Sequence, residues 1–166
     1  MRAMPFLVSA LLAATTTVHD PRDAGGKLDL RSATALRRGA LLILTISTYG
    51  EWSSTLLRSG GNGPSGPLAG KNRLTVLYDV NGDGKADFSG RIVYRGRLAM
   101  WITGKNQAFE PVPVSRPTRS SAFLTHPVDV LFSGKGTKTL RLAITSIDGA
   151  ARDRMPNHGW ISVPFG

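Results

Sequence analysis

The chain has 166 residues, 21 basic and 11 acidic side chains, a formal net charge of +10 and no cysteine. This length suits one domain with a core of its own, the hydrophobic content of 41% argues against a disordered chain, and the lack of cysteine excludes disulfides and thiolate metal ligands. The basic residues are scattered singly or in pairs such as Arg37-Arg38, so we expect a solvated basic surface and no nucleic-acid site.

The first residues have the order of a secretory signal peptide. Arg2 precedes an apolar stretch over Phe6–Ala14, and small residues follow this stretch. Because the segment is too short to span a bilayer, we expect residues 1–18 to be a leader and residues 19–166 to be a single secreted, extracellular domain that does not span the membrane. The alternative is that the segment forms the first strand or helix of the mature fold.

Short runs of β-branched and alternating apolar residues follow, separated by turn residues. Strands are expected at Leu28–Ala33, Ala40–Tyr49, Arg73–Val80, Phe88–Tyr94, Arg97–Thr103, Phe109–Val114, Val128–Ser133, Thr139–Ile147 and Trp160–Val163. Glu51–Arg58 predicts one helical turn, and Ser59–Lys71, with five glycines and two prolines, predicts an exposed loop. About nine short strands with hardly any helical periodicity predict an all-β fold, an antiparallel β-sandwich of jelly-roll or immunoglobulin-like layout, with a barrel as the less favoured alternative.

One segment carries a recognisable chemistry. Residues 79–87 read DVNGDGKAD and match the pattern D-x-[DN]-x-D-G-x-x-D, in which alternate residues of a tight loop can turn oxygen atoms toward a shared hard cation such as calcium. Gly84 permits the sharp turn that such a loop needs. The expected ligands are the side-chain oxygens of Asp79, Asn81 and Asp83, the main-chain carbonyl of Lys85, and Asp87 either directly or through water.

This loop departs from the helix-flanked calcium loop in two ways. Its twelfth position is Gly90 instead of a bidentate glutamate, and predicted strands flank it. We therefore expect a dissociation constant of about 10⁻⁴–10⁻³ M, as in extracellular modules. The alternative is a hairpin turn without a metal. Three of the eleven acidic residues fall within these nine positions, and their mutual repulsion favours the cation.

No pattern in the sequence indicates an enzyme. His19, His126 and His158 are far apart and match no zinc spacing, and residues 63–66 do not form a nucleophile elbow. Trp52, Trp101 and Trp160 would stack on sugar rings if they were exposed, but such residues more often cap a core. We therefore expect no catalytic residues, with a secreted hydrolase lacking a recognisable motif as an alternative.

Several short motifs together resemble a group of uncharacterised secreted bacterial β-sandwich proteins. They are Asp20-Pro21-x-Asp23, Leu28–Ser32, Thr48-Tyr49-x-x-Trp52, the hairpin Leu77–Phe88, and Thr145–Asp148 followed by Asp153–Gly159. More distantly, the layout is similar to family-nine carbohydrate-binding modules and DOMON-type domains, which bind sugars or haem. The resemblance implies an exported sandwich, and it carries no ligand-binding residue over to this chain.

Together these patterns predict a secreted, non-enzymatic, calcium-stabilised β-sandwich binding module. We expect a monomer whose ligand is a polysaccharide or a surface protein. A structural or protein-interaction domain at the cell surface is the alternative from another class, because no sequence feature identifies the ligand.

Overall fold

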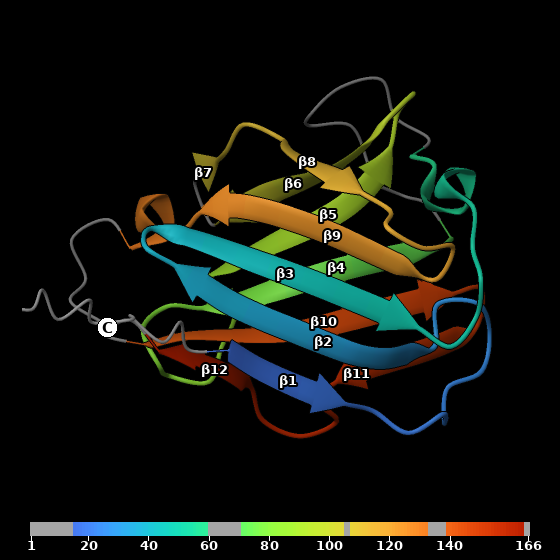
Figure 1. Ribbon diagram of the computed structural model, residues 1–166, viewed down its shortest axis with the longest axis horizontal. Coiled ribbons are helices and arrows are strands. Elements are labelled where there is room, and N and C mark those ends of the chain that lie inside the picture. The colour runs from blue at the N-terminus through green and yellow to red at the C-terminus, as the bar shows by residue number, and fades with distance from the viewer. Residues whose placement is uncertain (1–14, 60–70, 105–106, 133–138, 165–166) are drawn as a thin grey trace, which may run out of the picture.

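Antiparallel strands account for the regular structure of the chain. The computed structural model describes residues 15–59, 71–104, 107–132 and 139–164, and this part of the chain is all-β (Figure 1). Its elements in order are β1 (Thr15–His19), β2 (Leu30–Arg38), β3 (Leu41–Thr48), the 3₁₀ helix η1 (Ser54–Leu57), β4 (Arg73–Asp79), β5 (Phe88–Tyr94), β6 (Leu98–Gly104), β7 (Gln107–Ala108), β8 (Val112–Ser115), β9 (Ser121–Pro127), the 3₁₀ helix η2 (Asp129–Leu131), β10 (Thr139–Asp148), β11 (Ala151–Met155) and β12 (Ile161–Pro164). Within these ranges, no helix has the length and apolar character needed to cross a bilayer.

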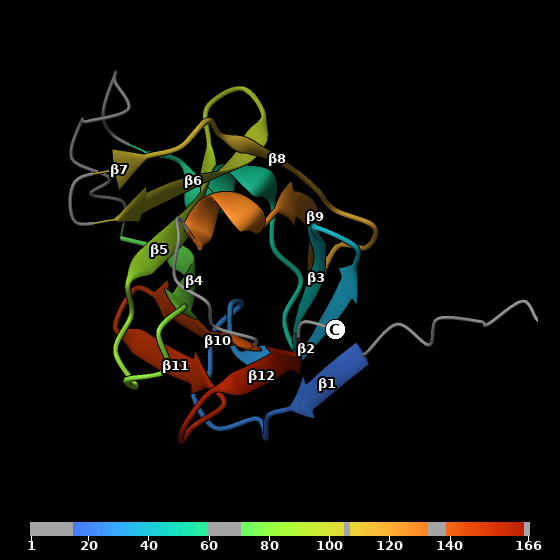
Figure 2. The same ribbon diagram turned by 90° about the vertical axis from the view of Figure 1, so that its left-hand side faces the viewer.

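The strands follow one hydrogen-bonded path that curls into a nearly closed, barrel-like shape. Its order is β1-β2-β3-β9-β8-β6-β5-β4-β10-β11, with β12 paired to β10 and β7 paired to β6. Strand β8 joins two halves, because it pairs with β9 through Val114 and with β6 through Val112. On the other side β1 and β12 lie side by side (Figure 1 and Figure 2), and the Thr16 hydroxyl donates to the Ser162 carbonyl at 2.9 Å. The all-β antiparallel prediction is confirmed, whereas the sandwich layout stays a prediction.

Four of the twelve strands in the described residues were not predicted. β1, β7 and β11 are polar or very short and carry no clear pattern, whereas β9 has buried apolar residues and was missed. β1, with the sequence TTTVH, pairs along its whole length with β2, and β11, with the sequence ARDRM, pairs likewise with β10. Strands β1 and β11 are each held mainly by main-chain hydrogen bonds to one neighbouring strand, because neither has a continuous buried face. Strand β1 includes residues 15–18 of the expected leader, while residues 1–14 of the leader and residues 60–70 of the expected loop lie outside the described residues.

One predicted strand is wrong. The segment predicted as strand Val128–Ser133 contains η2 instead, where the Leu131 amide donates to the Val128 carbonyl at 2.9 Å. Val128 and Leu131 are both buried, and their three-residue spacing places both apolar side chains on the inner side of a tight turn. The helical turn expected within Glu51–Arg58 is confirmed as η1.

The core lies inside the ring of strands seen in Figure 2. Strands β3 and β4 alternate buried with less buried residues, as their sequence pattern predicts. Their inward side chains are Leu42, Leu44, Ile46, Leu74, Val76 and Tyr78. This packing fixes the register of β4, and with it the position of the loop that follows.

Candidate functional site

The predicted calcium segment is the tight loop between β4 and β5. The Asp87 amide donates to the Tyr78 carbonyl at 2.8 Å and closes the loop, so that Tyr78 and Phe88 pair at the base of the hairpin. Residues 81–86 are exposed, whereas Asp79 is fully buried. Gly84 has φ of +82°, a left-handed conformation that glycine adopts without steric cost, as the sequence predicts for this position.

Asp79 organises the first half of the loop. Its Oδ1 accepts a hydrogen bond from the Gly82 amide at 2.6 Å, and its Oδ2 accepts one from the Gly84 amide at 3.0 Å. Arg141 stands opposite Asp79 on β10, with Nη1 3.6 Å from Oδ2, and the same nitrogen donates to the Gly82 carbonyl at 3.1 Å. The buried carboxylate therefore accepts hydrogen bonds from two main-chain amides and lies beside one guanidinium.

The other oxygen-bearing side chains of the loop also accept hydrogen bonds from residues within the loop. Asn81 Oδ1 accepts from the Asp83 amide at 2.9 Å, and Asp83 Oδ1 accepts from the Lys85 amide at 2.8 Å. Asp87 Oδ2 accepts from the Val80 amide at 2.9 Å, and its Oδ1 accepts from the Asn81 side-chain amide at 3.1 Å. Each carboxylate or amide oxygen has more than one lone pair, so a single amide bond does not exhaust its capacity to bind a cation.

The position that would hold a twelfth ligand cannot carry one. Gly90 lies in β5 and is buried against Met100 of β6, and a Cβ atom there would lie 2.7 Å from the Met100 sulfur. A glutamate at this position would enter the core rather than the loop. The structure thus explains why the sequence departs from the helix-flanked pattern at Gly90.

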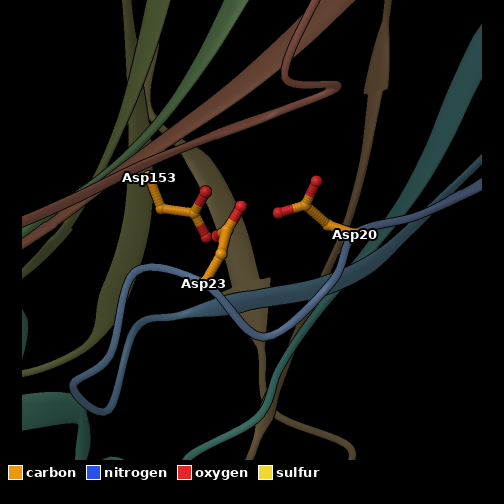
Figure 3. A group of neighbouring side chains, drawn as sticks. All are labelled: Asp20, Asp23 and Asp153. Atoms are coloured by element: carbon orange, nitrogen blue, oxygen red, sulfur yellow. The ribbon is translucent and has the colours of Figure 1, made fainter.

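The structure brings together a second group of carboxylates that the sequence analysis did not identify. Asp20, Asp23 and Asp153 each place a carboxylate oxygen within 4.8 Å of the others, and their carboxylates point toward one another (Figure 3). Burial, then the charges of Asp153 and Asp23, raise the pKa of Asp20 to about 6. Burial also raises the pKa of Asp153. Asp20 and Asp23 belong to a short motif, but only the fold brings Asp153 to them.

The three tryptophans divide into one core residue and two that are half-buried. Trp52 is buried, as predicted, with the Arg116 guanidinium 4.1 Å from its ring centroid. Trp101 is half-buried with Arg95 at 5.5 Å, and Trp160 is half-buried with Arg154 at 5.7 Å. Trp101 also lines a surface depression of about 250 Å³ together with Val93, Arg95, Arg97, Ala99 and Pro111.

No protein-family model, curated protein or solved structure matches this chain. The resemblance to secreted bacterial β-sandwich proteins, and more distantly to carbohydrate-binding and DOMON-type domains, therefore stays a prediction. The function has to be inferred from the geometry of the loop, the carboxylates and the surface aromatics.

Proposed function

We propose that the protein is a secreted, non-enzymatic binding domain of β-sandwich type whose Asp79–Asp87 loop takes up one calcium ion. The observation that carries this proposal is that the oxygen-bearing side chains at alternate loop positions are each held by hydrogen bonds within the loop. Asp79, Asn81 and Asp83 each accept an amide hydrogen bond from a residue further along the same loop. The carboxylates of Asp79, Asp83 and Asp87 do not meet within 4.8 Å as those of Asp20, Asp23 and Asp153 do. The hydrogen bonds nevertheless order the side chains before an ion arrives, which lowers the cost of ordering them when one binds.

The position of Arg141 is a reason to expect a modest affinity for calcium. Its guanidinium already lies beside Asp79, so a divalent ion must share or displace the charge that Arg141 supplies. The Arg141 side chain is 39% exposed and can turn toward water at little cost. Together with the missing twelfth ligand at Gly90, this favours a dissociation constant of about 10⁻⁴–10⁻³ M, as in extracellular modules.

Calcium titration of the loop variants tests the proposal. Calcium that binds only the folded protein stabilises it by about 2.7 kcal/mol at a hundredfold excess over the dissociation constant. For a domain of this size the melting temperature should rise by roughly 5–11 °C. Asp83→Asn removes a charge but keeps an oxygen for the Lys85 amide, and it should weaken the calcium effect. Lys85→Ala is the matched control and should leave the effect unchanged, because the side chain of Lys85 takes no part.

For the ligand of the domain, we propose a polysaccharide bound at the depression beside Trp101. A tryptophan ring is a flat apolar surface for a sugar ring. Arg95, which lies over the Trp101 ring, and Arg97 line the same depression and carry hydrogen-bond donors. A glycan screen with calcium and with chelator tests this, using Trp101→Ala against Trp160→Ala. Binding that both variants retain, or binding of a surface protein in place of any glycan, would favour the interaction-domain alternative.

A further inference from the structure

The carboxylates of Asp20, Asp23 and Asp153 lie at the seam where the first strands meet the last ones. Asp20 follows β1, Asp23 lies in the segment between β1 and β2, and Asp153 lies in β11 (Figure 3). Asp20 is 5% exposed, and its Oδ2 has no hydrogen-bond partner among the described residues. The adjacent Asp29 is 1% exposed, and its Oδ1 likewise has no partner. Unpartnered buried carboxylate oxygens are costly, and their cost calls for a compensating group.

Hydrogen bonds hold the main chain of Asp20 and the carboxylate of Asp153 in place. The Asp20 amide donates to the Arg31 carbonyl at 3.0 Å, and the Tyr49 hydroxyl donates to the Asp20 carbonyl at 2.8 Å. Asp153 Oδ2 accepts from the Leu30 amide at 2.6 Å, which ties β11 to the start of β2. These contacts fix the main chain at Asp20 and the carboxylate of Asp153, which keeps the two residues close together.

The neighbouring arginines do not neutralise the group. Within the described residues, no salt bridge reaches Asp20, Asp23, Asp29 or Asp153. Arg154 directs its guanidinium to the carbonyls of Pro156 and Gly159 instead. Asp23 is exposed, and a surface depression of about 370 Å³ at Asp23 and Asp153 gives an ion access from solvent.

We infer that Asp20, Asp23 and Asp153 form a second divalent-cation site, separate from the loop between β4 and β5, and that its ion is calcium. The mutual separation of the three oxygens, within 4.8 Å, suits an ion whose bonds to oxygen are about 2.3–2.6 Å long. The group contains only oxygen donors, which favours a hard cation over zinc or copper. An ion here would link the segment after β1 to β11 and so close the seam of the strand ring.

Calcium binding to the full metal-free chain, measured by isothermal titration calorimetry with calcium chloride, tests this inference. Asp23→Asn is the principal variant because Asp23 is exposed and its loss should not disturb folding. Asp20→Asn is the second, since asparagine keeps the shape and removes the charge. Glu110→Gln is the matched control, because it removes one exposed acidic charge outside the group. Both aspartate variants should weaken one binding event at least tenfold, and Glu110→Gln should not.

The outcomes separate this site from the loop. If Asp83→Asn loses one binding event and Asp23→Asn loses another, both sites hold an ion. If Asp23→Asn loses the binding event while Asp83→Asn matches the wild type, the seam site stands and the loop proposal fails. An unchanged calcium isotherm in Asp23→Asn overturns the seam site. A second result would also overturn it. If calcium does not bind at this group in the wild type, and metal-free Asp20→Asn is more stable than metal-free wild type, the aspartates only share a proton.

Discussion

The hydroxyl of Tyr78 lies 3.0 Å from Nε2 of His126, and the two rings meet edge to face with centroids 5.6 Å apart. Tyr78 is in β4 and His126 is in β9, so this contact joins the two halves of the strand ring across the core. His126 Nδ1 lies 2.9 Å from the Pro127 carbonyl, which can only accept, so Nδ1 carries the proton and Nε2 accepts from Tyr78. Burial raises the pKa of Tyr78, which keeps its hydroxyl a donor.

Tyr78→Phe should destabilise the protein through this contact. The substitution keeps the ring and removes the hydroxyl, leaving His126 Nε2 buried without its donor. The free energy of unfolding should fall by about 1–3 kcal/mol. Urea denaturation monitored by tryptophan fluorescence measures the loss, with Tyr94→Phe, a half-buried tyrosine, as the control. Equal stability of Tyr78→Phe and wild type would contradict the proposed role of the contact.

His126 should make the protein lose stability in mild acid. Burial lowers its pKa below the ordinary value of 6.5, against a smaller opposite effect of the Pro127 carbonyl. Below pH 6.5 the unfolded chain therefore binds a proton that the folded protein resists, and the free energy of unfolding falls as the pH drops toward the folded pKa. His126→Gln should reduce the difference in stability between pH 7.5 and pH 5.5, two conditions placed about one unit on either side of that value.

Asp20 titrates in the same range with the opposite sign. Its pKa is raised from 3.8 to about 6, so its contribution to stability increases as the pH falls through that interval. Because Asp20 is present in both the wild type and His126→Gln, the difference between their pH profiles isolates the histidine. Parallel profiles would mean that His126 is not the acid-sensitive group.

Removing Arg141 should strengthen calcium binding in the loop. Arg141→Gln takes away the cation that competes for Asp79 while retaining a donor for the Gly82 carbonyl. The partly exposed pair is worth about 1 kcal/mol or less, so affinity should rise by up to roughly fivefold. The same variant should melt at a lower temperature than wild type in chelator. Weaker calcium binding in this variant would show that Arg141 supports the site instead of competing for it.

Gly90→Glu should not repair the calcium loop. The added side chain would begin 2.7 Å from the Met100 sulfur, inside a packed core. Gly90→Ala alone should cost about 1–3 kcal/mol by overpacking, and Gly90→Glu should cost more because it also buries a charge. Chemical denaturation in chelator measures both, with Ser89→Ala on the neighbouring position as control. A Gly90→Glu protein of wild-type stability and higher calcium affinity would refute this account of the departure at Gly90.

The pairing of strand β1 with β2 limits where a leader can be cleaved without loss of a paired strand. Thr15–His19 pairs with β2 along its whole length, so cleavage between Thr15 and Asp20 would remove part of a paired strand. We therefore expect the mature N-terminus of the exported protein at Ala14 or Thr15, in place of residue 19 as expected from the sequence alone, and intact mass spectrometry determines it. A chain that starts at Asp20 should also melt at a lower temperature than one that starts at Ala14. An intact Met1 on protein confined to the cytoplasm would contradict the export prediction.

The sequence by itself determined the all-β class and most of the strands that bury an apolar face, although β9 was not predicted. Phe88–Tyr94 coincides with β5, and Arg73–Val80 differs from β4 by one residue, because alternating apolar residues and bounding turn residues act locally. The tight turn at Asp79–Asp87 could also be predicted from the sequence, because its hydrogen bonds join residues that are close along the chain. A polar strand such as β11 could not, because its stability comes from the ladder to β10.

Only the tertiary structure decided which distant residues meet. Nothing near Asp153 in the sequence indicates that it faces Asp20 and Asp23, or that Tyr78 donates to His126. These contacts follow from the strand order and from the registers with which β10 pairs with β4 and β9 pairs with β3. Both are set by how all the buried faces pack at once. Local patterns specify elements, whereas the free energy of closing the strand ring specifies their neighbours.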